Sequence, residues 1–394
     1  MTTPLIKGWC PGALRPMLSG DGLLVRVRPS AGRLTQAQAS GIAHLAARHG
    51  SGLIDLSARA NLQIRGVTDH TYAPLVSGLA ALGLIDPTPE AEARRNIVVT
   101  PYWQAGDDTA ELAEHLSRVL LDDRTLTLSG KFGFAVDTGP QPVLHDVSAD
   151  IRIERDSTGS LLCRADGVAR GARVTPDSMA DAALTLVRWF VASGGRGRMA
   201  AHLANGATLP ATFAACEAAP TRAAPFPASP VPAPGLSTAG FMIGLAFGQM
   251  HARTLAALAT LAPLRVTPWR MLLLEGQTRA PDISGIITRP DDPLLHVVAC
   301  TGAPACTQGV QPTRKLARAL APHIPAGTLL HLSGCTKGCA HPGPAALTLA
   351  AHAQGFDLIR NGTAAAPPVR RGLTAEHLLA TPGILTEGTD APSL

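Results

Sequence analysis

Four of the seven cysteines in this chain lie in two short loops, and their spacing suits a metal centre. The first loop reads CTGAPAC (300–306) and the second begins CTKGC (335–339). Structural zinc favours tight C-x2–4-C pairs, which the second loop meets and the C-x5-C of the first does not. A cubic 4Fe-4S cluster is wider and tolerates the longer loop. The spacing therefore favours a 4Fe-4S cluster, with zinc or four unrelated thiols as alternatives; the predicted ligands are Cys300, Cys306, Cys335 and Cys339.

Two apolar segments lead into these loops and are predicted to be strands. LLHVVAC ends at Cys300, and GTLLHLSGC ends at Cys335. Loops at the ends of two such strands can face each other and bring four thiolates together. The loops also contain glycines, which allow the backbone to approach a cluster closely and to point N–H groups at its sulfides; these are Gly302, Gly334, Gly338 and Gly343.

Composition limits the classes of function. The chain has 394 residues, is 46% hydrophobic and carries a net charge of +5, which is enough apolar sequence for two or three domains. The basic excess is dispersed, which favours an anionic small substrate over nucleic acid. We expect no signal peptide and no membrane span, because the apolar stretches are too short. A cytoplasmic protein is therefore expected, in which such cysteines indicate metal binding or redox work.

An internal repeat is visible on either side of a linker. Residues 208–235 are rich in Ala and Pro and are predicted to connect two halves. Residues 20–66 and 237–276 share a short apolar strand, a Gly-containing turn, an Ala/Leu-rich helix and two short strands around an arginine. We align Arg59 of the first segment with Arg270 of the second. The repeat predicts an α+β core with a pseudo-two-fold axis.

The rest of the chain alternates between helical and strand patterns. Helices are predicted near 36–48, 72–83, 108–121, 177–193, 251–261 and 312–321. Strands are predicted near 22–28, 52–57, 61–67, 131–136, 149–154, 241–247, 294–299, 328–332 and 346–350.

The cysteine spacing and three further stretches resemble the sulfite and nitrite reductase superfamily. SARANLQIRG (57–66), RRNIVVTP (94–101) and LSGKFGFAVD (128–137) are similar to its basic motifs and occur in the same order. The resemblance implies α+β architecture, with two ferredoxin-like half-domains joined as a pseudo-dimer and two α/β lobes. The expected boundaries are 1–85 and 236–288 for the half-domains, 86–207 for the first lobe, 208–235 for the linker and 289–394 for the cluster-bearing lobe.

Finer features resemble the branch of this superfamily that acts in aerobic cobalamin synthesis. They include CPGALRPMLSGDGLLVRVRP (10–29), ACTGAPAC (299–306), LRVTPWRMLLL (264–274) and SGCTKGCAHPG (333–343). This resemblance implies hydroxylation of precorrin-3A by dioxygen, with closure of a lactone to give precorrin-3B. It also implies a 4Fe-4S cluster, an external electron donor such as an NADH-linked reductase, ferredoxin or flavodoxin, and a mononuclear non-haem iron whose ligands the sequence does not identify. Neither nucleic acid nor membrane is an expected partner.

Several basic residues are candidates for the site. Arg59, Arg95 and Lys131 match superfamily residues that surround the substrate anion, so the resemblance implies a catalytic role for them. The motif usually has a second lysine where this chain has Gly133, which weighs against reduction of an oxyanion. Arginines that could pair with the carboxylates of a tetrapyrrole are Arg26, Arg28, Arg265 and Arg270. Alternation along the strand would place Arg26 and Arg28 on one face.

Two other functions stay open from the sequence. One is a sirohaem-dependent sulfite or nitrite reductase, and the other is a non-catalytic tetrapyrrole- or metal-binding protein. Cys10 lies in the turn GWCPG and is interpreted as an exposed thiol rather than an iron ligand. His341 follows the last cluster cysteine by two positions, where it would lie near the cluster or cap a loop.

Overall fold

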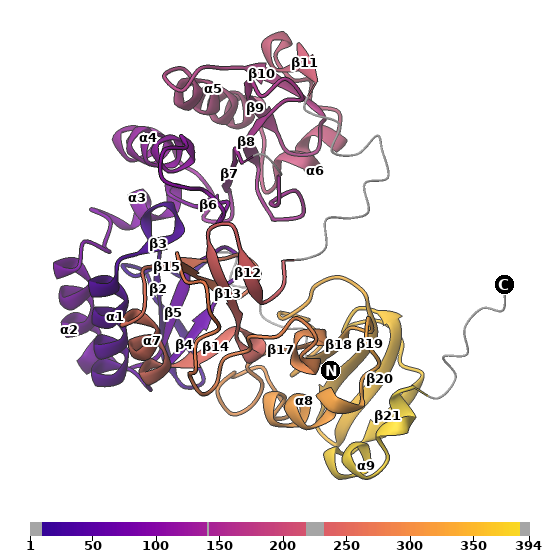
Figure 1. Ribbon diagram of the computed structural model, residues 1–394. Coiled ribbons are helices and arrows are strands. Elements are labelled where there is room, and N and C mark those ends of the chain that lie inside the picture. Colours follow the sequence, from indigo (N-terminus) through magenta and orange to yellow (C-terminus); the bar gives the residue numbers. More distant parts are fainter. Residues whose placement is uncertain (1–9, 140–141, 218–231, 387–394) are drawn as a thin grey trace.

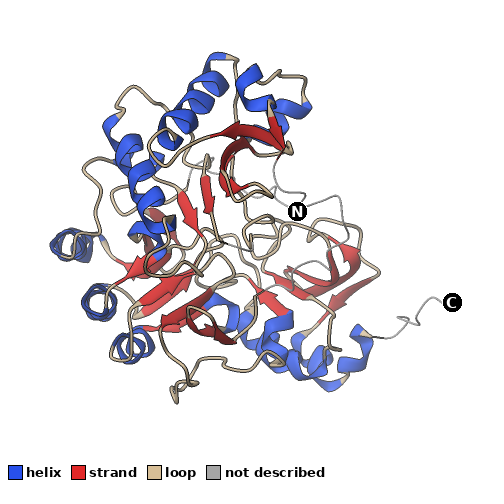
Figure 2. Cartoon of the chain, turned by 45° about the horizontal axis from the view of Figure 1, so that its top comes forward, coloured by secondary structure: helices blue, strands red, loops and turns tan. Residues whose placement is uncertain are grey.

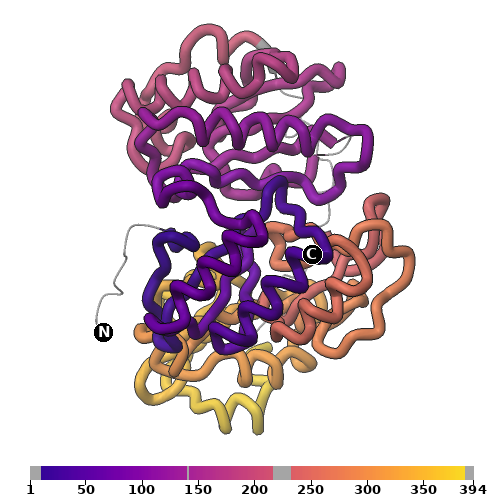
Figure 3. The backbone as a smooth tube through the Cα atoms, turned by 90° about the vertical axis from the view of Figure 1, so that its left-hand side faces the viewer, coloured from indigo at the N-terminus to yellow at the C-terminus, as the bar shows by residue number. Residues whose placement is uncertain are grey.

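The computed structural model describes residues 10–139, 142–217 and 232–386, and these form two half-domains and two lobes (Figure 1). The middle lobe lies against one side of the half-domains and the C-terminal lobe against another (Figures 1 and 3). Most helices lie on the outside of the molecule, with the strands toward its middle (Figure 2). No helix in these ranges combines the length and the apolar character needed to cross a bilayer.

The first half-domain is a sheet covered by two helices on one face. Thr35 caps the first helix with a capping box to Gln38, which explains why the helix begins directly after it. Buried Ala and Ile side chains of this helix pack on the sheet. The elements are β1 (Met17–Ser19), β2 (Gly22–Val27), α1 (Gln36–His49), β4 (Leu53–Leu56), β5 (Leu62–Val67) and α2 (Asp69–Ala81).

The second half-domain repeats this arrangement, and the two halves exchange edge strands. Its elements are β12 (Gly235–Ser237), β13 (Gly240–Gly244), α7 (Ala252–Ala259), β15 (Leu264–Val266) and β16 (Met271–Glu275). The short strand β3 (Arg33–Leu34) of the first half pairs with β15, while β14 (Gln249–His251) of the second half pairs with β4. Each sheet therefore gains its outer strand from the other half, and the predicted pseudo-two-fold core is confirmed.

Positive backbone φ angles show which residues of the two half-domains correspond to each other. Gly66, next to the last residue of β5, and Gly276, directly after β16, have φ of 67° and 66°. Six residues earlier in each half, Ala60 and Arg270 also have positive φ, at 53° and 61°. Arg270 is thus the counterpart of Ala60, and our alignment of Arg270 with Arg59 was wrong by one residue. Arg59 lies one residue before the last position of its turn, whereas Arg270 occupies the last position of its own turn. Aligning the two arginines therefore shifted the repeat by one residue.

The middle lobe is a mixed sheet with helices on its faces. Strands β6, β7 and β8 are parallel, and the remaining strands are antiparallel. The predicted strand at 131–136 begins only at Phe134, so Lys131 lies in the turn before it. The elements are α3 (Pro89–Arg94), β6 (Ile97–Val99), α4 (Thr109–Asp122), β7 (Phe134–Asp137), β8 (Ile151–Arg155), β9 (Leu161–Ala165), β10 (Arg170–Arg173), α5 (Met179–Ala192), α6 (Met199–Ala204) and β11 (Cys216–Glu217).

The predicted linker at 208–235 falls partly inside the described ranges. Residues Ala211–Ala214 form a 3-10 turn, and β11 pairs with β10 as the edge of the middle sheet. At the other end, Gly235 already begins β12. Residues 218–231 lie outside the described ranges, and the domain boundaries stay predictions.

The C-terminal lobe positions the cysteine loops. Strands β17, β18 and β19 are parallel, so the carboxyl ends of neighbouring strands meet at one edge. The predicted strand at 294–299 is shorter than expected, because residues 293–296 form a 3-10 turn. The elements are β17 (Val297–Ala299), α8 (Arg314–Leu320), β18 (Leu330–Ser333), β19 (Ala345–His352), β20 (Gly355–Gly362), β21 (Arg370–Leu373) and α9 (Ala375–Ala380).

Candidate active site

The two cysteine loops meet at the ends of β17 and β18. The Cys300 N–H donates to the carbonyl of Leu332 at 3.2 Å, and the Val310 N–H donates to that of Gly334 at 2.9 Å. In the other direction, the Gly334 N–H donates to Sγ of Cys300 at 3.0 Å. The loops are therefore joined by hydrogen bonds at the point where both leave the sheet.

Electrostatics show that the four thiols are neighbours. Burial raises the pKa of Cys300, and the nearby Cys306 and Cys335 raise this pKa further. N–H groups of Gly334 and Gly302 oppose that shift, because they stabilise a thiolate. Burial also raises the pKa of Cys339; the other three thiols add to the rise, and Lys337 opposes it.

Four thiols are a donor set that fits an iron–sulfur cluster. Within the described ranges, no three His, Cys, Asp or Glu side chains are grouped closely enough to hold one metal ion. The thiols are nonetheless close enough to affect one another's ionisation. A cube of iron and sulfide is held by four thiolates and spans a wider site than zinc. A Cβ added at Gly334 would lie 3.3 Å from Sγ of Cys300, so glycine keeps this space open.

A cavity of about 420 Å³ opens beside the thiols, between the first half-domain and the C-terminal lobe. Two of the predicted ligands, Cys300 and Cys339, line it. Five arginines also line the cavity, namely Arg26, Arg59, Arg65, Arg270 and Arg314. Asp55 lines the cavity as well and pairs with Arg65 and Arg314. The positive charge beside the thiols therefore comes mainly from Arg26, Arg59 and Arg270, which suits a ligand that carries several carboxylates.

Three of the predicted arginines reach this cavity. Burial lowers the pKa of Arg26 to about 10, and burial also lowers the pKa of Arg59 and of Arg270. Arg59 has a buried Nη1 with no hydrogen-bond partner in the structure, so part of its guanidinium is free for a ligand. Arg270 instead donates Nη2 to the carbonyl of Ala340, beside Cys339, at 3.1 Å.

Comparisons with known proteins identify the family. Residues 15–82 match the model of the nitrite/sulfite reductase ferredoxin-like half domain. A precorrin-3B synthase of Sinorhizobium sp. is 30% identical to this chain over 401 residues, covering 91% of this chain and 83% of that protein. The chain belongs to the precorrin-3B synthase family.

Two further relatives connect this family to the reductases. A ferredoxin–nitrite reductase of Synechococcus elongatus is 25% identical over 83% of this chain and 76% of that protein. The solved structure of the Mycobacterium tuberculosis NirA protein superposes with a TM-score of 0.64 at 16% identity, covering 94% of this chain and 82% of that one. The predicted α+β fold of the sulfite and nitrite reductases is thereby confirmed.

The other predicted arginines of this precorrin-3B synthase family member lie outside the cavity and hold the fold together. Arg28 is buried and pairs with Glu92 at 2.6 Å. Arg95 makes two bonds to Asp86, at 2.8 and 2.9 Å. Arg265 is likewise buried, and its guanidinium pairs with a carboxylate of its own sheet and donates to two backbone carbonyls; the partners are Glu275, Pro101 and Trp103.

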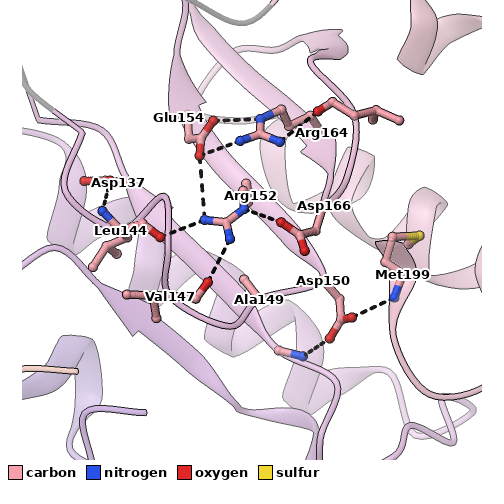
Figure 4. A network of polar contacts seen from close by, with 12 residues as sticks. Asp137, Leu144, Val147, Ala149, Asp150, Arg152, Glu154, Arg164, Asp166 and Met199 are labelled. Atoms are coloured by element: carbon pink, nitrogen blue, oxygen red, sulfur yellow. Dashed lines mark hydrogen bonds and ion pairs between the residues drawn. The ribbon is translucent and has the colours of Figure 1, made fainter. Parts of the chain in front are cut away.

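Lys131 contributes through its backbone. Its side chain is exposed and does not line the cavity, but its carbonyl accepts bonds from Arg59 at 2.9 Å and from Arg198 at 2.6 Å. Asp150 stabilises this turn, because its buried carboxylate accepts hydrogen bonds from the N–H groups of Gly133 and Met199 (Figure 4). The Lys131 turn therefore sets the position of Arg59 at the cavity.

The network around Asp150 continues along β8. Arg152 bonds Asp166 at 2.7 Å and donates to the carbonyls of Leu144 and Val147 (Figure 4). Glu154 links Arg152 to Arg164 (Figure 4). This network ties the loop before β8 to the sheet, and so supports the turn that carries Lys131.

Sequence reasoning missed residues of the site. Cys10 is half-buried on the cavity wall, within hydrogen-bonding reach of Arg26, so its interpretation as an exposed thiol was wrong. Arg65 was not selected, although it stands in the same stretch, SARANLQIRG (57–66), that indicated Arg59.

Proposed function

We propose that the chain is an oxygen-dependent monooxygenase that converts precorrin-3A to precorrin-3B. In this reaction one atom of dioxygen becomes a hydroxyl on a ring carbon and the other becomes water, with two electrons and two protons consumed. A carboxylate arm of the substrate then closes a lactone onto the ring. The observation that carries the proposal is the cavity that Arg26, Arg59 and Arg270 share with Cys300 and Cys339.

The cavity residues would bind and orient the substrate. A precorrin is a metal-free tetrapyrrole with acetate and propionate arms, so guanidinium groups give it planar, bidentate partners. Arg26 and Arg59 approach from the first half-domain, while Arg270 approaches from the second. Burial of these groups strengthens their interaction with carboxylates, because water screens the charges less.

The cysteines would hold the redox group. Cys300, Cys306, Cys335 and Cys339 are the proposed ligands of a 4Fe-4S cluster, which supplies electrons singly to the adjacent cavity. An external donor (an NADH-linked reductase, a ferredoxin or a flavodoxin) would reduce it. The described residues show no grouping of three ligands for a mononuclear iron, so we assign none to that ion. A cytoplasmic location agrees with thiols that stay reduced.

A sirohaem-dependent sulfite or nitrite reductase is the second candidate, supported by the 25% identity to a nitrite reductase. Gly133 weighs against it. A Cβ at Gly133 would lie 2.9 Å from the side-chain nitrogen of Asn96, and its N–H is bonded to Asp150. The position is therefore packed and offers no second lysine to the site. Six-electron reduction of an oxyanion needs dense positive charge beside the reacting atoms.

Protein purified without oxygen tests the proposal. We expect about four irons and four acid-labile sulfides per chain, the stoichiometry of one cube. After addition of precorrin-3A, a reductant and dioxygen, we expect a product heavier than the substrate by one oxygen atom. Cys306→Ser should lose the brown colour, whereas Cys163→Ala, in the core of the middle lobe, should keep it. Zinc without sulfide would overturn the cluster, and rapid conversion of sulfite to sulfide would favour the reductase.

A further inference from the structure

His331 is a fully buried histidine whose ring has no hydrogen-bond partner among the described residues. It lies on β18, four positions before Cys335, and its side chain is 0% exposed. Neither ring nitrogen contacts a donor or acceptor within residues 10–139, 142–217 and 232–386. Burial, with His341 and Arg270 nearby, lowers its pKa to about 4, so the ring is neutral and offers one N–H donor and one acceptor. Buried polar groups are rarely left unsatisfied, so a partner is missing from this position.

The ring lies under the loop that carries Cys339. Leu330 and Leu332 of β18 pack into the core with α8, so His331 between them points to the other face of the sheet. There, Cε1 of His331 is 3.7 Å from the Cβ position of Gly338, and its ring centroid is 5.9 Å from that of His341.

The opposite side of this loop faces the cavity. Cys339 and Ala340 both line the cavity, and Arg270 binds the Ala340 carbonyl from that side. His331 does not line the cavity, so a substrate there would meet the cysteine loop first. The missing partner therefore belongs to whatever the cysteines hold rather than to the substrate.

We propose that His331 would donate its ring N–H to the iron–sulfur cluster held by the neighbouring cysteines, and would thereby raise the cluster's reduction potential. The inference rests on the proposed function, since it needs the cluster. A hydrogen bond to sulfur withdraws negative charge and so stabilises the reduced cluster, which is the more negative form. The donor would thereby make the cluster easier for an external reductase to reduce.

A redox titration of anaerobically purified variants, followed by electron paramagnetic resonance, tests this role. His331→Leu keeps an apolar side chain of moderate size and removes the donor. At a fixed solution potential, its ratio of reduced to oxidised cluster should fall about tenfold, a shift of about 59 mV for one electron. His331→Gln keeps an N–H donor and should recover most of the wild-type ratio. Thr109→Val removes a buried hydrogen bond in the middle lobe, to the Thr138 hydroxyl, and should leave the ratio unchanged.

Each outcome distinguishes the inference from the proposed function. An intact cluster at the wild-type potential in His331→Leu would overturn the role of His331. A weaker affinity for the tetrapyrrole without a change of potential would also overturn it, because His331 would then face the substrate. If the unmodified protein holds no cluster, the proposed function itself fails. Should His331→Leu not fold, His331→Met supplies the comparison, since methionine adapts to irregular space.

Discussion

Arg65 donates Nη2 to the carbonyl oxygen of Ala305 at 3.2 Å, which joins the first half-domain to the loop between Cys300 and Cys306. The Ser19 hydroxyl and the Gly20 N–H donate to the same oxygen, at 2.8 and 3.1 Å. Arg65 is only 4% exposed, and carboxylates hold its guanidinium in place. Ala305, the residue next to Cys306, is thus held by hydrogen bonds from the first half-domain.

Replacing Arg65 should loosen this anchor. Arg65→Met removes the bond to Ala305 and leaves Asp21 without its cation, whereas Asp55 keeps its contacts to Arg314 and Gln249. The expected cost is about 3 kcal/mol, the lower end for a broken buried pair. We expect a lower free energy of unfolding and at least a twofold loss of iron and sulfide per chain. Arg289→Gln is the control, because Arg289 is exposed and its ion pair is to Asp291. Full cluster content in Arg65→Met would show that the anchor is dispensable.

A methyl group at Gly334 should separate the two cysteine loops. The added Cβ in Gly334→Ala would lie 3.0 Å from Cα of Gly302 and 3.3 Å from Sγ of Cys300. Overpacking of this kind costs about 1–3 kcal/mol, and here it acts directly on a proposed ligand. Chelator challenge should remove iron faster than from the wild type. Gly383→Ala, where nothing lies within 4 Å of the added Cβ, should match the wild type; equal rates in both variants would contradict the prediction.

Arg59 and Lys131 should differ in substrate binding. Arg59→Met removes a charged partner from the cavity, worth about 1.5–3 kcal/mol, so the Kd for a precorrin should rise roughly 10- to 100-fold. Lys131→Met leaves the carbonyl that holds Arg59 in place, and we expect less than about a threefold change, as for most surface substitutions. Fluorescence titration with the tetrapyrrole measures both. A large rise in the Kd for Lys131→Met, with no rise for Arg59→Met, would contradict this prediction and would indicate that the lysine side chain contacts the substrate.

Asp137 should make stability depend on pH. Its carboxylate is 1% exposed, and burial raises its pKa to about 6, despite bonds from the N–H groups of Val143 and Leu144. Between about pH 4 and pH 6 the folded state holds this proton more firmly than the unfolded state does. Its contribution is therefore present below about pH 4 and is lost as the pH rises to 6, on the order of 3 kcal/mol in all.

Urea unfolding of Asp137→Asn measures this effect. The difference in unfolding free energy between variant and wild type should change across that window and be constant above about pH 7. The same pH dependence in both proteins would assign the effect to other groups.

Much of the fold could be predicted because its signals are local. The helix predicted at 36–48 is found as Gln36–His49, since its cap and its apolar spacing both lie within the segment. The exchanged strands β3 and β14 could not be predicted. They are two and three residues long, and their partners lie more than 190 residues away in sequence, so no local pattern marks them.

The residues of the site likewise divide into those that a local sequence pattern predicts and those that it does not. Cys300 and Cys339 could be selected from spacing alone, and the structure brings them to one cavity with Arg26, Arg59 and Arg270. Arginines of the cavity and arginines of the scaffold look alike in the sequence. Arg265 stands in a motif as suggestive as that of Arg270, yet its charge is taken up by Glu275. What distinguishes Arg265 from Arg270 is the carboxylate of Glu275 on the neighbouring strand, and the sequence does not show that the two residues are close.

The exchange of β3 and β14 means that neither half-domain is a complete folding unit. Each half on its own would leave a sheet edge unpaired and would extend a strand with nothing to pair with. Two copies of a single half could satisfy both needs by the same exchange, as a two-fold symmetric dimer. The fused chain keeps that symmetry in its backbone while freeing each copy to change its side chains, so that Ala60 in one half and Arg270 in the other occupy the same turn. Cutting the chain between the halves should therefore give two fragments that fold only when mixed.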